Sequence, residues 1–211
     1  MAIRNFTDLA YSKSVKAMQQ HLGSRDRNEE LERDARNTEV TDGLAAFLAE
    51  RTSILIATAS KSGWPYLQHR GGPKGFVRTL DRHTIAFADY PGNKQYVTLG
   101  NLSENPKATI LAIDHAERQR VKIWGEARLV EDDRDLLDSL MPPGIAVYVS
   151  RAIRFRVLAW DINCPSHIPQ LFTLDEVESA SAAMLARIAE LETQLSTRTG
   201  SKGKRRSSSP A

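Results

Sequence analysis

Cysteine is nearly absent from this sequence, because Cys164 is the only one among 211 residues. A single thiol excludes a disulfide within the chain and any zinc site built mainly from thiolates. The chain also lacks a run of eighteen apolar residues, and its first ten residues (MAIRNFTDLA) lack the apolar core of a signal peptide. Neither a G-x-G-x-x-G motif nor a Walker loop is present. We therefore expect a soluble, cytoplasmic protein without a Rossmann or P-loop domain and without membrane contact.

The positive charge of the chain is concentrated at its C-terminus. The net charge is +3 and the sequence pI is about 9.1. Five basic residues and no acidic ones follow from Arg198 onward, which leaves 24 basic and 26 acidic residues in the rest of the chain. Because the remainder is slightly acidic, the pI does not predict a nucleic-acid partner. We expect residues 197–211 to form a disordered basic tail, since they carry little apolar surface.

The N-terminal residues 1–43 are polar and have helical patterns. Val15, Met18 and Leu22 recur at helical spacing, and a stretch of alternating charges follows them. Thr41 is a good N-cap for a further helix whose apolar face includes Leu44. We therefore predict a helical N-terminal segment that leads into the main domain.

Residues 164–196 are predicted to form a loop and a C-terminal helix. Apolar residues recur there at the alternating spacings of three and four that are typical of a coiled-coil seam. These residues are Leu174, Val177, Met184, Ile188, Leu191 and Leu195. The same spacing fits a helix that packs on the rest of the protein, and about three heptads do not distinguish the two arrangements.

The central residues 44–163 have the pattern of an antiparallel β-protein. A short apolar run at 53–59 is followed by a Ser-Lys-Ser-Gly turn and a second extended run at 64–70, which together predict a β-hairpin. Further strands are predicted at 76–80, 84–88, 108–114, 120–130 and 153–160, with a helix at about 93–102 and another at 132–140. Few helices separate these strands. We therefore predict a mainly β fold, a six-stranded antiparallel split β-barrel with helical attachments.

Two segments carry the residues expected of an anion site. In the first, Arg70 and Lys74 surround a Gly-Gly-Pro sequence directly after a strand, and glycine lets backbone amides approach a bound group. The second continues from the strand at 84–88 into Asp89, a Pro-Gly turn and Asn93-Lys94, where a helix is expected to begin. A charged barrel rim and a solvated lysine explain the same residues without any ligand. Alternation also places Arg120, Lys122 and Trp124 on one strand face, which is equally compatible with ordinary edge-strand charge.

Other reactive side chains have no partner that the sequence identifies. His69 and His167 could donate a proton, but an isolated histidine is more often structural. The histidines have no ligand-like spacing, so no metal site is predicted. Cys164 has no second cysteine with which to resolve a redox step. No catalytic residue is assigned.

Three segments together resemble the FMN-binding split β-barrels, the pyridoxamine 5'-phosphate oxidase-like proteins. In chain order they are QHRGGPKGF (68–76), FADYPGNKQYVTLGNLSENP (87–106) and VKIWGEARLVEDD (121–133), and the resemblance extends from about Leu44 to Trp160. An uncharacterised bacterial subgroup of this family also has an Asn-Cys-Pro-x-His segment, which corresponds to 163–167 here. Each motif is weak alone, whereas three in this order are specific.

The resemblance implies a homodimer with FMN at the subunit interface. Arg70 would contact the FMN phosphate, with Lys74 nearby, and Asn93 and Lys94 match the basic pair of the family at a helix start. Of this pair, the resemblance makes Lys94 the stronger candidate for the phosphate. The residues that would line the flavin itself are Phe87, Ala88 and Asp89, with Arg120 where the family often has a glutamine near the isoalloxazine ring.

The function that this resemblance implies is that of an FMN-dependent oxidoreductase. Hydride would pass through flavin N5 to or from an unidentified small substrate, with NAD(P)H as a candidate donor. True pyridoxamine phosphate oxidase activity is not expected, because Gly75 stands where those enzymes have a lysine and their C-terminal Arg-x-His motif is absent. The alternative is a non-catalytic flavin or tetrapyrrole carrier, or a stress-response protein, on the same barrel.

Overall fold

The computed structural model describes residues 3–142, 148–163 and 166–203. It contains two compact units, Met1–Ile168 and Pro169–Ala211. Among the described residues, the first unit holds the sheet and helices α1 to α6, and the second holds α7. Cys164 lies outside the described residues.

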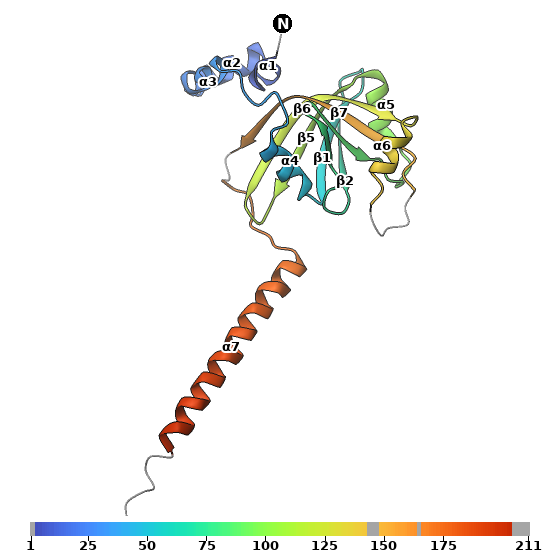
Figure 1. Cartoon of the computed structure of the whole chain (residues 1–211). Coiled ribbons are helices and arrows are strands. Elements are labelled where there is room, and N and C mark those ends of the chain that lie inside the picture. The colour runs from blue at the N-terminus through green and yellow to red at the C-terminus, as the bar shows by residue number, and fades with distance from the viewer. Residues whose placement is uncertain (1–2, 143–147, 164–165, 204–211) are drawn as a thin grey trace, which may run out of the picture. The chain divides into compact units, whose positions relative to one another are not determined.

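The strands of the first unit form one antiparallel sheet in the order β2-β1-β5-β6-β7-β4-β3 (Figure 1). They are β1 (Ser53–Ala59), β2 (Pro65–Gly71), β3 (Arg78–Asp81), β4 (Thr84–Ala88), β5 (Lys107–Asp114), β6 (Gln119–Val130) and β7 (Ala152–Asn163). The predicted mainly β, antiparallel split-barrel class is confirmed. The described sheet has seven strands where six were expected. Each of the seven overlaps a strand segment predicted from the sequence, and the shortest is β3, an edge strand of four exposed residues that pairs with β4.

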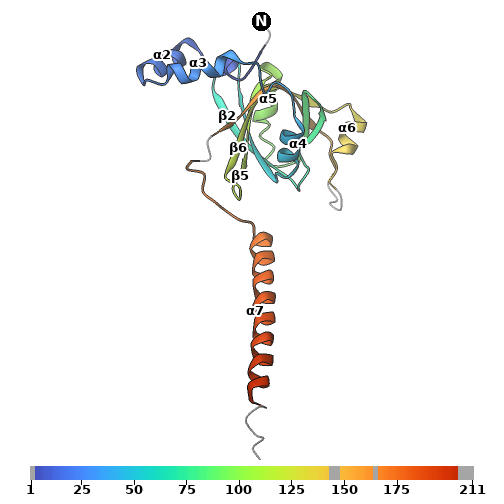
Figure 2. The ribbon, with the colours of Figure 1, turned by 60° about the vertical axis from the view of Figure 1, so that its left-hand side comes forward.

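One face of the curved sheet and helix α4 (Asp42–Ala49) enclose the main core (Figure 2). Alternate residues of β1, β5 and β6 are buried, as expected for strands with one face toward a core. Thr41 caps α4 by accepting a hydrogen bond from the Leu44 amide at 3.2 Å. This cap sets the helix so that Leu44 and Leu48 are buried among the strand residues.

A register shift interrupts the pairing of β6 with β7 at Gly125. A Cβ atom built there would lie 2.1 Å from the Arg156 carbonyl oxygen and 2.3 Å from the Phe155 ring. The backbones of β6 and β7 therefore approach each other so closely at this point that only glycine fits at position 125. This irregularity lets two long strands curve around the core.

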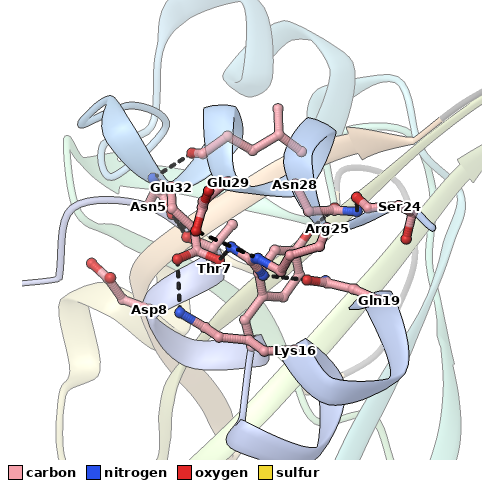
Figure 3. Close-up of polar contacts among 12 residues, drawn as sticks. Asn5, Thr7, Asp8, Lys16, Gln19, Ser24, Arg25, Asn28, Glu29 and Glu32 are labelled. Atoms are coloured by element: carbon pink, nitrogen blue, oxygen red, sulfur yellow. Dashed lines mark hydrogen bonds and ion pairs between the residues drawn. The ribbon is translucent and has the colours of Figure 1, made fainter. Parts of the chain in front are cut away.

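Three short helices precede α4 and form a small polar cluster: α1 (Thr7–Ala10), α2 (Lys13–His21) and α3 (Arg25–Arg33). Figure 3 shows Arg25 of α3 between Gln19 of α2 and the carboxylates of Glu29 and Glu32, with Lys16 also paired to Glu32 at 2.7 Å. The fully buried Asn5 side chain joins this group by donating to two carbonyl groups of the α3 end.

Aromatic and backbone contacts attach this N-terminal segment to the sheet. The Phe6 ring stacks on Trp124 of β6 with 5.3 Å between the ring centroids. The indole Nε1 of Trp160 in β7 donates to the Glu39 carbonyl at 2.8 Å. Trp124, whose face was expected to carry strand charge, therefore serves as the platform for residues near the N-terminus.

The remaining helices are α5 (Val97–Glu104) and α6 (Arg134–Ser139) in the first unit and α7 (Leu174–Gly203) in the second. Helix α7 continues to Gly203 rather than ending near Leu195, so the first residues of the expected tail are helical, and 204–211 lie outside the described residues. Within the described chain, no helix combines the length and apolar character required to cross a membrane.

Candidate functional site

A cavity of about 250 Å³ lies where β2 and β4 end and the loop to α5 begins. Three half-buried residues of β2 line it: Tyr66, Gln68 and Arg70. They lie on one side of the strand because side chains alternate between faces. Ala88, Asp89, Asn93 and Lys94 line the cavity from β4 and the following loop. The structure therefore brings together five of the eight residues predicted to hold the cofactor: Arg70, Ala88, Asp89, Asn93 and Lys94.

Asp89 binds two arginines at the base of this cavity. Its carboxylate is 2.5 Å from Nη1 of Arg70 and 3.0 Å from Nε of Arg151, and the residue is only 6% exposed. The Asp89 amide also donates to the Arg151 carbonyl at 2.9 Å, so the two segments are fixed by their backbones as well. The hydrogen bond to Asp89 raises the pKa of Arg151 above its ordinary value. The carboxylate thus holds both guanidinium groups in place.

The cavity retains donor capacity and positive charge beyond what Asp89 satisfies. Arg70 Nε is buried and makes no hydrogen bond within the described part of the chain. A buried donor without a partner is costly and marks a place where a ligand oxygen would be stabilised. Arg70, Lys94 and Arg151 oppose the single Asp89 carboxylate, so these four groups carry a net charge of +2. A phosphate group matches both the charge and the donors.

The loop before α5 has a strained backbone at the cavity edge. Lys94 and Tyr96 have φ angles of 57° and 53°, a left-handed conformation that non-glycine residues rarely adopt. Asn93 Oδ1 accepts a hydrogen bond from the Gln95 amide at 3.1 Å, which closes a tight turn. The prediction that Asn93 and Lys94 begin a helix is therefore wrong, because this turn delays α5 until Val97.

The N-terminus of α5 faces the same cavity. Its N-cap residue Tyr96 makes no side-chain cap, and Val97, Thr98 and Leu99 of its first turn line the cavity. First-turn amides and the positive end of the helix dipole favour a bound anion. The Arg151 guanidinium carbon lies 5.3 Å from the Tyr96 ring centroid, which links the helix start to the arginine pair.

Three predicted site residues lie elsewhere. Phe87 is fully buried in the main core, where alternation along β4 directs it away from the cavity. Lys74 lines a second cavity of about 520 Å³ and pairs with Glu50 at 2.9 Å. Arg120 is half-buried on β6, opposite Ile113 of β5 and Asn163 of β7. Their roles toward a cofactor remain predictions. Of the two histidines considered as proton donors, His69 lines the first cavity and His167 does not.

Arg151 and Tyr96 are the site residues that the sequence reasoning missed. The pairing of Ala88 with Ala152 brings Arg151 beside Asp89, although 62 residues separate them in the chain. Only the register of β4 against β7 could have identified this arginine. The described residues contain no group of three or more histidine, cysteine or acidic side chains suited to a metal.

Comparison with solved structures finds distant likenesses. HupZ of Group A Streptococcus is 15% identical, with a TM-score of 0.44 over 63% of this chain and 98% of its own. An FMN-binding protein of Syntrophomonas wolfei is 12% identical, with a TM-score of 0.46 over 68% and 97% of the two chains. General Stress Protein 26 of Bacillus anthracis is 11% identical, with a TM-score of 0.43 over 56% and 89%.

No curated protein sequence matches the chain. The family model described as pyridoxamine 5'-phosphate oxidase matches residues 40–167. This match covers more than half of the sequence, including every strand and the whole lining of the cavity around Asp89. The chain therefore belongs to the pyridoxamine 5'-phosphate oxidase family.

Proposed function

We propose that the protein is an FMN-dependent oxidoreductase and that the cavity around Asp89 binds the FMN phosphate. The observation that carries this proposal is the cationic cavity itself. It combines three basic side chains, a buried guanidinium nitrogen without a partner and the first turn of a helix. These are the donors that a phosphate dianion requires.

Each residue around the cavity has a distinct part in holding the phosphate. Arg70 offers its remaining N–H groups, because Asp89 engages only Nη1. Asp89 acts as a positioning residue for Arg70 and Arg151, whose side chains are 17% and 23% exposed. Lys94 adds a charge at the exposed edge of the cavity. The α5 amides complete the donor set.

Bound flavin would supply hydride transfer through its N5 atom. The contribution of the chain is to bind and orient this group, and no acid or base is assigned. We do not propose pyridoxamine phosphate oxidation. Gly75 has a φ of 82°, a conformation in which a lysine at this position would be strained. The neighbouring Lys74 is already paired with Glu50.

We further propose that two copies of the chain share each flavin. Sites for ligands of drug or cofactor size occupy roughly 300–1,000 Å³, whereas the cavity around Asp89 measures about 250 Å³. One chain therefore offers room for the phosphate end, and a second copy would cover the ring. Lys74 and Arg120, which lie away from the cavity around Asp89, would meet the flavin only within such an assembly, whereas the Phe87 side chain is fully buried.

Titration with FMN and riboflavin tests the cofactor proposal. The two molecules share the isoalloxazine ring, but riboflavin lacks the phosphate. The purified apoprotein should bind FMN at micromolar concentrations and riboflavin much more weakly. Equal affinities would reject the phosphate cavity, and the absence of binding to either molecule would reject the whole proposal.

A second measurement tests the enzymatic part separately. The FMN-loaded protein should consume NAD(P)H in the presence of an electron acceptor, at a rate that depends on FMN occupancy. A protein that binds FMN but transfers no electrons from any reductant in a panel would retain the cavity assignment and lose the oxidoreductase assignment.

A further inference from the structure

We propose that α7 forms a parallel two-stranded coiled coil with α7 of a second copy of this chain. The helix is continuous over 30 residues (Figure 1). From Leu174 to Leu195 the seam positions recur at spacings of three, four, three, four, three and four. Six of these seven positions are apolar, and Ser181 is the exception. This spacing is the one that a left-handed coiled coil requires.

The apolar seam of α7 is exposed over the described residues from Leu174 to Leu195. Helix α7 is the only helix or strand described between residues 169 and 203. Its seam side chains are between 41% and 71% exposed. They are Leu174, Val177, Met184, Ile188, Leu191 and Leu195. A long helix with a continuous exposed apolar seam is stabilised when a second helix covers that seam.

One of the three heptads of the seam has the residue combination that favours two strands. With Leu174 at the first core position of a heptad, Ile188 occupies an a position and Leu191 the following d position. A β-branched residue at a and leucine at d are the combination that selects parallel dimers. Leu185 adjoins the seam at an e position and widens the apolar surface.

The flanking charges select the parallel orientation. In a parallel pair, each g residue faces the e residue of the next heptad on the other helix, so Arg187 meets Glu192 of the second copy. In the antiparallel register that places Val177 opposite Leu195, Glu178 would meet Glu192 of the second copy and Arg187 would meet its own equivalent. Like charges in those places disfavour that arrangement. The attraction between Arg187 and Glu192 in the parallel pair is the charge match that this seam offers to a second copy of the same helix.

Cysteine cross-linking of the full chain tests this arrangement. In a Cys164→Ser background, Ser181→Cys places one thiol at an a position, where two parallel helices bring equivalent side chains together. Ala186→Cys at the outward f position is the matched control. Under mild oxidation, Ser181→Cys should form covalent dimers at least tenfold faster than Ala186→Cys. Equal rates, or no dimer from Ser181→Cys, would overturn the proposal. Either result is expected if α7 instead packs on its own barrel or on another protein.

A charge exchange tests the orientation independently. Arg187→Glu in the Ser181→Cys chain should slow disulfide formation severalfold, and adding Glu192→Arg should restore it. Arg187 also pairs with Glu190 on its own helix, and that contact is lost in both variants. Restoration therefore reports the contact between helices, and failure to restore the rate would overturn the parallel register. Because neither test uses a flavin, its outcome is independent of the cofactor proposal.

Discussion

Replacing Arg70 by alanine separates phosphate binding from structural support. The change removes the buried Nε and the guanidinium that Asp89 holds. Asp89 keeps its contact with Arg151 at 3.0 Å, so no buried charge is left alone and the fold should persist. A charge-assisted hydrogen bond contributes about 1.5–3 kcal/mol. The dissociation constant for FMN should therefore rise about 10- to 150-fold.

Riboflavin makes this measurement specific to the phosphate. Quenching of flavin fluorescence gives the affinity of each variant for FMN and for riboflavin under identical conditions. The Arg70→Ala protein should bind riboflavin almost as the unaltered protein does, since riboflavin offers Arg70 no phosphate. The difference in binding free energy between the two flavins should therefore shrink by about 1.5–3 kcal/mol.

Arg82→Ala is the matched control for this experiment. Arg82 is 81% exposed, pairs loosely with Glu39 at 3.4 Å and lies outside the cavity lining. Its loss should leave both flavin affinities unchanged. The phosphate role of Arg70 would be refuted if Arg70→Ala bound FMN normally, or if it weakened FMN and riboflavin equally. A loss confined to the melting temperature would assign Arg70 a structural role alone.

Three further changes probe other parts of the molecule. Lys94→Ala should weaken FMN binding by about 1.5–3 kcal/mol and leave riboflavin binding nearly unchanged. An equal loss of affinity for both flavins would contradict a phosphate role for Lys94. Gly125→Ala should lower the free energy of unfolding, measured in urea, by about 1–3 kcal/mol, because the added Cβ has no space. Gly100→Ala is the control, since a Cβ at Gly100 has no atom within 4 Å and should not destabilise the protein. Asp114→Asn removes a contact with Arg51 at 2.5 Å and should cost about 1.5–3 kcal/mol at pH 7.

The pH dependence of the Asp114 effect has a definite sign. Burial alone would raise the pKa of Asp114, but hydrogen bonds from the Glu117 amide and the Arg51 guanidinium outweigh burial and lower it. A lowered folded-state pKa gives stabilisation that is complete above the unfolded value of about 3.9. This stabilisation is lost as the pH falls through the folded-state pKa. The difference between Asp114→Asn and the unaltered protein in urea unfolding should therefore shrink below about pH 4, and a difference that grew there would contradict this assignment.

The sequence was most informative where short-range pattern determines structure. The strand at 53–59 and the strand at 84–88 have the bounds that alternation and turn residues predicted. Arg70 and Asp89 were also identified, because Arg70 lies one residue before the end of β2 and Asp89 directly follows β4. Local signals were sufficient for the strand bounds because alternation and turn residues fix a hairpin, whereas the contact of Arg70 with Asp89 joins two strands, β2 and β4, that do not pair.

Features that depend on distant pairing could not be predicted in the same way. Arg151 reaches Asp89 through the register of β4 against β7, for which the sequence carries no local mark. The start of α5 was misplaced because a turn with two left-handed residues, Lys94 and Tyr96, resembles a helix start in composition. The partner of α7 was left open because heptad spacing and an ordinary amphipathic helix coincide over three heptads.

The shared carboxylate of Asp89 also has a kinetic consequence. Because Arg70 and Arg151 are held before any anion arrives, binding requires little ordering of these side chains. Lys94, in contrast, is exposed at the rim of the cavity. Its charge would attract an approaching anion through a long-range electrostatic interaction whose range decreases as the salt concentration rises. If the cavity binds the phosphate as proposed, Lys94 would govern the encounter rate of the ligand and the arginine pair its residence time.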